Sequence, residues 1–233
     1  MHKCFLIVGC SVLGLLLASC GSKESSEWVT LFDGKTLKGW TIPSGYNGEV
    51  SVENGAITGV ISKEMFHLRT VDSYEDFILE LEFKIDSGLN SGVQIRSGLL
   101  ENDSTFDYTA GRPDLPVTKR SFKAGTFAGY QFEIETSDRS WTGGFYEEGG
   151  RGWLQPLMDD QPSKKAFRPG DWNHMRIMAQ GNHFQSWLNG EQAADHYDAK
   201  TSSGFIGFQF HDTRNDDLVG GKVRFKNIRI KEL

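Results

Sequence analysis

The chain has few cysteines, and all of them lie near one end. Cys4, Cys10 and Cys20 fall within the first 20 of the 233 residues. The remaining residues therefore offer no thiol for a disulfide, a thiolate nucleophile or a cysteine-ligated zinc ion. These absences exclude disulfide-stapled scaffolds, cysteine-dependent enzymes and cysteine-ligated zinc domains for residues 21–233.

No apolar run is long enough to span a bilayer. The longest, residues 5–17, holds 13 residues, against the ~20 that a membrane-spanning helix needs. It follows a short basic start and precedes Leu17-Ala18-Ser19-Cys20, a sequence typical of a lipobox. We therefore predict a lipoprotein signal peptide over residues 1–19 and a polar tether over 20–27 that begins at lipidated Cys20. The protein would then be anchored by its lipid in a bacterial cell envelope, facing the periplasm or the surface.

Excess basic charge is also absent. The formal net charge is −6, and without residues 1–19 it becomes −7, from 24 basic and 31 acidic residues. An acidic body without a basic stripe argues against nucleic acid as a partner. The phosphate loop, the nucleophile elbow, the His-Glu-x-x-His motif and the dinucleotide fingerprint are missing as well.

No segment repeats its apolar residues with the period of an α-helix, and the sequence instead predicts short strands. Residues 77–85 alternate apolar and mostly charged side chains, and Asn54-Gly55 is a strong hairpin signal. Roughly ten to thirteen such strands indicate one all-β domain over residues 28–233, an antiparallel β-sandwich or jelly roll. The polar residues 98–128 are predicted to form a long loop, either a lid or a binding loop.

The most informative stretch is residues 129–153. Its first seven residues alternate, so that Gln131, Glu133 and Glu135 share one strand face at ~7 Å intervals. A glycine-rich loop with Trp141 and Tyr146 follows. A polar column beside aromatic side chains suits a cleft that binds a sugar.

Two further strands present polar residues opposite their apolar ones. If the three strands are neighbours, cross-strand spacing of ~5 Å brings their polar residues into one patch. The predicted patch comprises Gln94, Arg96, Gln131, Glu133, Glu135, Gln209 and His211. Substrate contacts are also predicted for the following residues: Trp141, Tyr146, Arg151 and Trp187.

Each of these residues also has a purely structural interpretation. Glu133 and Glu135 could form a solvated strand face, Arg96 could pair with a carboxylate, and His211 could be an ordinary surface or core histidine. The loop aromatics could serve packing alone. Direct displacement at a glycosidic bond is disfavoured, because two carboxylates side by side on one strand are poorly placed to flank a substrate.

Eight segments resemble the 3-keto-disaccharide hydrolase domain family, whose fold is a concanavalin A-like sandwich. They are LFDGKTLKGW (31–40), SGLNSGVQIRS (87–97), GYQFEIE (129–135), SWTGGFYEEGGRGWL (140–154), DWN (171–173), SWLNGE (186–191), GFIGFQFH (204–211) and VRFKNIRIKEL (223–233). Together they run along nearly the whole of residues 28–233. The segment 98–128 and the doubled Glu147-Glu148 are the departures that could alter the substrate.

The resemblance implies cleavage of glycosides that carry a ketone at sugar carbon 3. A base removes the acidified C2 proton, the enolate expels the C1 leaving group, and water adds to the enone. In this scheme Glu133 or Glu135 is the base, Arg96 stabilises the enolate, and His211 is an acid, a base or a metal ligand. Glu133, Glu135 and His211 could instead hold a divalent cation as a Lewis acid.

Two other functions remain open at this point. The same cleft could belong to a non-catalytic, lectin-like carbohydrate-binding module, or to a structural envelope domain without an active site, because a fold does not determine function. If the protein is an enzyme, its chemistry requires a separate sugar 3-oxidoreductase to supply the keto sugar.

Overall fold

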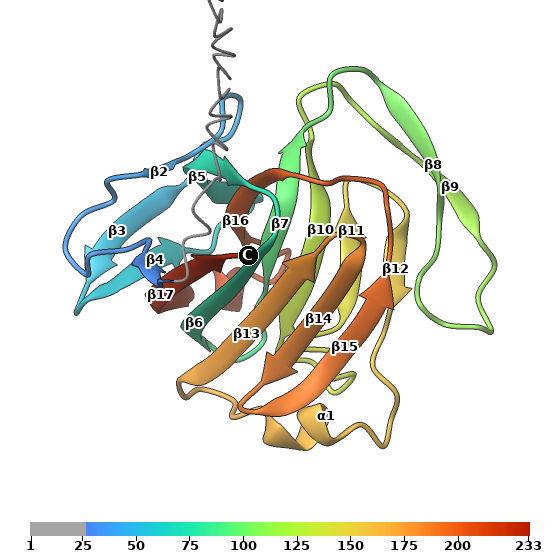
Figure 1. Cartoon of the computed structure of the whole chain (residues 1–233). Coiled ribbons are helices and arrows are strands. Elements are labelled where there is room, and N and C mark those ends of the chain that lie inside the picture. The colour runs from blue at the N-terminus through green and yellow to red at the C-terminus, as the bar shows by residue number, and fades with distance from the viewer. Residues whose placement is uncertain (1–26) are drawn as a thin grey trace, which may run out of the picture.

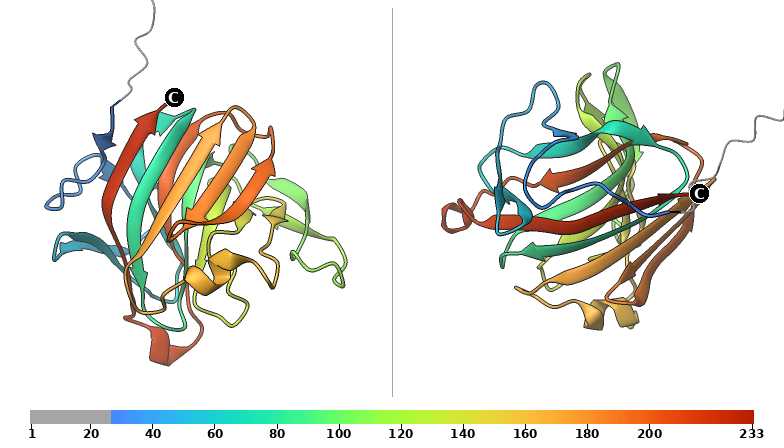
Figure 2. Two further views of the ribbon diagram at one scale, coloured as in Figure 1. Left: turned by 60° about the horizontal axis from the view of Figure 1, so that its bottom comes forward. Right: turned by 60° about the vertical axis from the view of Figure 1, so that its left-hand side comes forward.

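Two antiparallel β-sheets packed face to face form the body of the protein (Figures 1 and 2). The computed structural model describes residues 27–233; the predicted signal peptide, lipidated Cys20 and nearly all of the tether lie outside the described residues. The prediction of an all-β antiparallel sandwich is confirmed. Between residues 27 and 233, no helix has the length and apolar character needed to cross a membrane.

The first sheet has eight strands and forms the front layer in Figure 1. In spatial order its strands are β15 (Glu191–Tyr197), β14 (His183–Leu188), β13 (Asn173–Gln180), β6 (Phe77–Ile85), β17 (Lys222–Glu232), β4 (Ala56–Val60) and β3 (Glu49–Glu53), with β1 (Val29–Thr30) paired to β17. The hairpin predicted at Asn54-Gly55 joins β3 to β4, and Asn54 has the positive φ of 50° that this turn requires.

The second sheet has seven strands and carries the polar residues of interest. In spatial order they are β12 (Gly152–Gln155), β11 (Phe145–Glu148), β10 (Phe127–Glu135), β7 (Asn90–Leu99), β16 (Gly204–Phe210), β5 (Phe66–Tyr74) and β2 (Trp40–Thr41). The three strands expected to be neighbours, β10, β7 and β16, are adjacent at the centre of this sheet.

Two parts of the chain differ from expectation. The predicted loop 98–128 contains a two-stranded hairpin, β8 (Ser104–Tyr108) with β9 (Thr118–Phe122), which projects to the side of the sandwich in Figure 1. The glycine-rich segment after β10 is also paired, as β11 and β12, at the edge of the second sheet. One short helix, α1 (Pro162–Ala166), and a 3₁₀ turn, η1 (Asp216–Leu218), complete the described elements.

Apolar side chains from the two inner faces form one continuous core. The five residues predicted to face inward from β6 are all buried: Phe77, Leu79, Leu81, Phe83 and Ile85. On β10, Tyr130, Phe132 and Ile134 face the same core. Because successive strand residues point to opposite faces, Gln131, Glu133 and Glu135 lie on the outer face of the second sheet.

Candidate functional site

Residues paired across three neighbouring strands form the floor of a polar cleft, and Glu133 is one of them. Glu133 on β10 is opposite Gly92 on β7, which is opposite Gln209 on β16. Gly92 leaves space that the Gln131 side chain fills, since a Cβ added there would lie 2.4 Å from Cδ of Gln131. The cleft encloses about 210 Å³ above this floor.

Glu133 is a strongly perturbed acid in the cleft. Its side chain is buried, and its two carboxylate oxygens accept hydrogen bonds from Nδ2 of Asn90 at 2.6 Å and Nε2 of Gln131 at 2.9 Å. Burial outweighs these bonds and raises the pKa of Glu133 from 4.5 to about 8. A carboxyl group with such a pKa can hold or release a proton near neutral pH.

Glu135 does not line the cleft, but it holds the Arg139 guanidinium, which does. Its carboxylate accepts hydrogen bonds from the Arg139 guanidinium at 2.7 Å and from the backbone N–H of Trp141 at 2.7 Å. The guanidinium then lies 3.7 Å from Glu133 and 4.4 Å above the Trp141 ring. Glu135 thus orients Arg139 beside the perturbed acid.

Aromatic side chains form the walls, as the sequence predicted for Tyr146. Tyr146 on β11 and Trp153 on β12 are 5.3 Å apart in an edge-on arrangement, and both border the cleft. Tyr108 comes from the β8–β9 hairpin, so the segment predicted as a loop supplies one wall. Rings around a polar floor can stack on the apolar faces of a sugar.

Glu148, Gln209 and His211 also line the cleft. Nε2 of Gln209 donates to the Glu148 carboxylate at 3.0 Å, and burial raises the pKa of Glu148. Nδ1 of His211 lies 2.9 Å from the Asp212 carbonyl oxygen. If the proton is on Nδ1, Nε2 of His211 is left as an acceptor.

Arg96 is not on this face, which corrects its predicted place in the patch. Its φ is +45°, and the pairing of β7 with both neighbouring strands shifts register at this point, so the alternation of side chains is interrupted. The guanidinium is buried, donates to the carbonyl oxygens of Glu75 and Gly181, and pairs with Asp76 at 2.7 Å. It ties loops together at one end of the sandwich.

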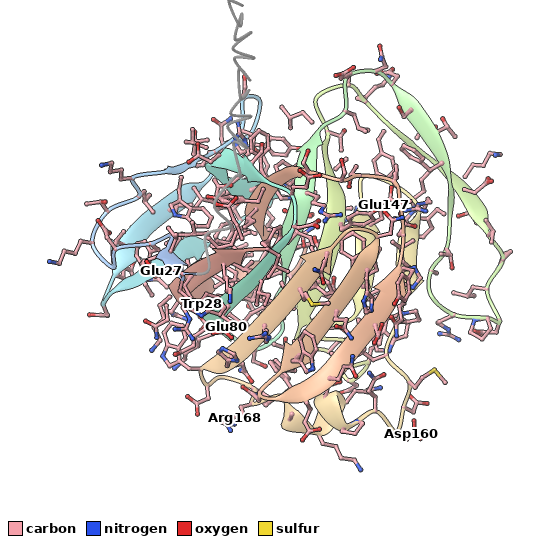
Figure 3. All side chains as sticks on the ribbon, in the orientation of Figure 1. Glu27, Trp28, Glu80, Glu147, Asp160 and Arg168 are labelled. Atoms are coloured by element: carbon pink, nitrogen blue, oxygen red, sulfur yellow. The ribbon has the colours of Figure 1, made fainter. Side chains whose placement is uncertain are left out.

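Three other predicted contacts are also absent from the cleft. Trp187 lies on β14 of the other sheet and faces outward, because Ser186 and Leu188 take the inward positions. Trp141 is buried against Trp153, and Arg151 pairs with Glu147 and Asp198. Glu147, labelled in Figure 3, lies on β11 next to Glu148 but faces the opposite side of the strand.

The predicted patch is therefore assembled in part. Gln131, Glu133, Gln209 and His211 line the cleft. Gln94 lies beneath the floor, where its Nε2 donates to Oε1 of Gln131 at 3.0 Å. Six residues of the cleft were not among the predicted site residues: Asn90, Tyr108, Arg120, Arg139, Glu148 and Trp153. Their positions depend on strand pairing and loop folding, which the sequence does not display. Glu148 had a signal in the sequence, the doubled Glu147-Glu148.

A metal site made of Glu133, Glu135 and His211 does not fit this geometry. Across residues 27–233, no three His, Cys, Asp or Glu side chains converge as cation ligands would. The Glu135 carboxylate is already occupied by Arg139 and the Trp141 N–H. A divalent cation as cofactor stays a prediction.

The sequence matches one known domain family along most of its length. The model of the 3-keto-alpha-glucoside-1,2-lyase-like domain matches residues 27–231. The comparison with curated proteins gave no significant match. The family match spans the whole sandwich, including the cleft.

Three solved structures share the fold at low sequence identity. A protein from Parabacteroides distasonis assigned as a glycosyl hydrolase is 21% identical, with a TM-score of 0.58, over 88% of this chain and 94% of that one. The carbohydrate-binding module CBM66 from Bacillus subtilis is 15% identical, with a TM-score of 0.56, over 83% and 96%. The β-glucanase of Bacillus licheniformis is 14% identical, with a TM-score of 0.57, over 90% and 99%. All three are sandwiches like this one.

Proposed function

Because the chain belongs to the 3-keto-alpha-glucoside-1,2-lyase-like family, we propose that it cleaves the glycosidic bond of 3-keto-glycosides or 3-keto-disaccharides in the cleft above Glu133. The family match supports a carbohydrate-related function. The observation that carries the proposed chemistry is one buried carboxyl group with a pKa of about 8, held beside a cation in a cleft with aromatic walls.

In this proposal Glu133 is the general base. Its carboxylate takes the C2 proton, the electron pair forms the enolate, and the enolate expels the C1 oxygen, which leaves as an alcohol once protonated. Water then adds across the enone, so the overall reaction is hydrolysis. Arg139 takes the enolate-stabilising role first predicted for Arg96, because its guanidinium lies in the cleft near Glu133. His211 is the candidate acid for the leaving group.

The decisive experiment uses residues 21–233 with a 3-keto-disaccharide and with its unoxidised parent, each with and without a chelator. We expect sugar release from the keto compound alone. Loss of release with the chelator would add a divalent cation to the mechanism. Binding of either sugar without cleavage would favour the lectin-like module, which the ring-lined cleft also suits.

The pH dependence of kcat/KM tests the role of Glu133. Since the base must be ionised, kcat/KM should rise about tenfold per pH unit below pH 8 and level off above it. The rate of spontaneous breakdown of the keto sugar is subtracted at each pH. A profile that instead falls through pH 8 would make Glu133 an acid, and a flat profile would remove it from the chemistry.

Gly92→Ala tests the shape of the floor. The new methyl group would displace Gln131 and with it a hydrogen bond to Glu133. Small displacements in an active site can be costly, so kcat should fall roughly ten- to hundredfold. Gly98→Ala on the same strand is the matched control, because a Cβ there meets nothing within 4 Å. Equal kcat for the two variants would contradict this arrangement.

The location of the protein and its biochemical partner complete the proposal. The lipobox that ends at Cys20 supports a lipid-anchored protein of the bacterial envelope. The proposed substrate carries a ketone, so a sugar 3-oxidoreductase must act before this protein. Labelling cells with a fatty-acid analogue should mark the wild type and leave Cys20→Ala unmarked.

A further inference from the structure

Arg120 brings a positive charge to the cleft from outside the sandwich. It lies on β9 and borders the cleft, although the hairpin that carries it projects from the body of the protein (Figure 1). Its guanidinium lies 3.4 Å from the centroid of the Tyr108 ring on the paired strand. Contact with the ring face holds the guanidinium in place and leaves its N–H groups, which lie in the plane of the guanidinium, free to donate.

Arg120 differs from its basic neighbours in the same hairpin. Lys119 pairs with Asp107 at 2.8 Å, and Lys123 pairs with Asp103 at 2.6 Å, both on exposed surface. Among the described residues, Arg120 forms no ion pair of this kind. Because residues 119 and 120 point to opposite sides of β9, Lys119 lies outside the cleft and Arg120 faces it.

The acids of the cleft do not neutralise Arg120 in full. Glu133 has a pKa of about 8 and keeps its proton at neutral pH. Burial raises the pKa of Glu148, while the charges of His211 and Arg120 oppose that rise. Glu135 is ionically paired with Arg139 at 2.7 Å. An anionic group on a ligand could therefore bind here without displacing a carboxylate of the protein.

We propose that Arg120 binds an anionic group, such as a carboxylate, on the part of the glycoside that extends from the cleft toward the β8–β9 hairpin. The protein then favours anionic glycosides over neutral ones of the same shape. The identity of the ligand as a glycoside rests on the proposed function; the preference for negative charge rests on Arg120, Tyr108 and the cleft itself.

The test compares two aryl 3-keto-glucosides, one of 4-hydroxybenzoate and one of 4-hydroxybenzamide, at pH 7 and low salt. The quantity measured is the ratio of kcat/KM for the charged compound to that for the neutral compound. Comparing this ratio between wild type and variant cancels the difference in leaving-group reactivity. Lys119→Gln is the matched control for Arg120→Gln, since it removes an adjacent charge that faces away from the cleft.

Arg120→Gln should lower the ratio about tenfold, the size expected for loss of one charge-assisted hydrogen bond. Lys119→Gln should leave the ratio unchanged, and added salt should reduce the wild-type preference. An equal fall in kcat/KM for both compounds, or an unchanged ratio, would overturn the proposal.

Calorimetric titration separates this inference from the proposed function. Both compounds are titrated into wild type and into each variant, which gives the ratio of dissociation constants even if neither compound is cleaved. If the ratio of dissociation constants depends on Arg120 but neither compound is cleaved, the proposed reaction is contradicted and the charge preference is supported. If both compounds are cleaved and the ratio does not depend on Arg120, the charge preference is contradicted and the proposed reaction is supported. Failure to bind either compound would contradict both proposals.

Discussion

Glu133→Gln is expected to lower kcat for 3-keto-disaccharide cleavage by about 10²- to 10⁴-fold, the usual contribution of a positioned general base. The amide has nearly the shape of the carboxyl group but cannot accept the C2 proton. Aromatic walls, Arg139 and Arg120 remain in place, so KM should change much less than kcat. Initial rates at several substrate concentrations at pH 8 measure both constants.

The neighbouring amides can accommodate this substitution. Gln131 now donates to Glu133 and accepts from Gln94, whose own Oε1 has no partner among the described residues. If the Gln131 and Gln94 amides both turn over, the amide introduced at position 133 can donate to Oε1 of Gln131. Nε2 of Gln131 can then donate to Oε1 of Gln94, so the hydrogen bond between the two amides is kept with its direction reversed.

Glu133→Gln should also change how stability depends on pH. The folded protein keeps the Glu133 proton up to a pH of about 8, whereas the unfolded chain releases it near 4.5. Between these values the folded state binds more protons, so the free energy of unfolding of the wild type falls as the pH rises. Between pH 4.5 and pH 8 the free energy of unfolding falls by an amount on the order of a few kcal/mol. Glu133→Gln removes this dependence on pH, because glutamine does not titrate.

Glu49→Gln is the control, because Glu49 lies exposed on β3 in the other sheet. Chemical denaturation at pH 5 and pH 8 compares the three proteins. The stability gap between pH 5 and pH 8 should shrink in Glu133→Gln and persist in Glu49→Gln. A Glu133→Gln protein that turns over substrate at the wild-type rate would remove Glu133 from the chemistry, whatever its stability.

Period-2 alternation made much of the fold predictable from the sequence. In residues 77–85 every second side chain is apolar, and those five side chains are buried in β6. The Asn54-Gly55 hairpin was predictable for a local reason, because both residues tolerate positive φ. Such features depend on neighbours along the chain, which the sequence displays directly.

The cleft was only partly predictable, because alternation fixes strand faces but not strand order or bulges. It identified Gln131, Glu133 and Gln209 as sharing a face, and long-range pairing of β10, β7 and β16 brings them together. Arg139 comes from a loop folded back by Glu135, and Arg120 from a distant hairpin. No local pattern encodes contacts of that kind.

Arg96→Met is expected to destabilise the protein by about 3–5 kcal/mol, because a buried guanidinium loses several hydrogen bonds at about 1–3 kcal/mol each. Methionine keeps an unbranched apolar stem but lacks the guanidinium, so the loss combines hydrogen bonds with the space that the buried guanidinium filled. The carbonyl oxygens of Glu75 and Gly181 and the Asp76 carboxylate would lose their donors. Those groups belong to separate turns of the chain, which Arg96 holds together at one end of the sandwich.

The same substitution should barely affect the chemistry, because Arg96 lies outside the cleft. For a chain of this size the stability loss corresponds to a fall in Tm on the order of 10 °C. Arg139→Met provides the contrast in activity: its guanidinium lies near Glu133, so kcat should fall, and Tm should fall as well because the buried Glu135 carboxylate loses its ion pair. Calorimetric melting and steady-state rates at 15 °C, where both variants remain folded, measure the two effects.

The outcome separates a structural arginine from one that acts on the substrate. If Arg96→Met melts early but keeps its kcat, the left-handed residue in β7 serves the fold, and the enolate needs a cation from the cleft. If Arg96→Met melts normally and loses kcat, Arg96 must reach the substrate in another conformation, because here each of its three guanidinium nitrogens donates to a group of the protein. Arg96→Lys refines the first outcome: lysine keeps the charge but lacks the planar fork, so it should recover part of the lost Tm and leave kcat unchanged.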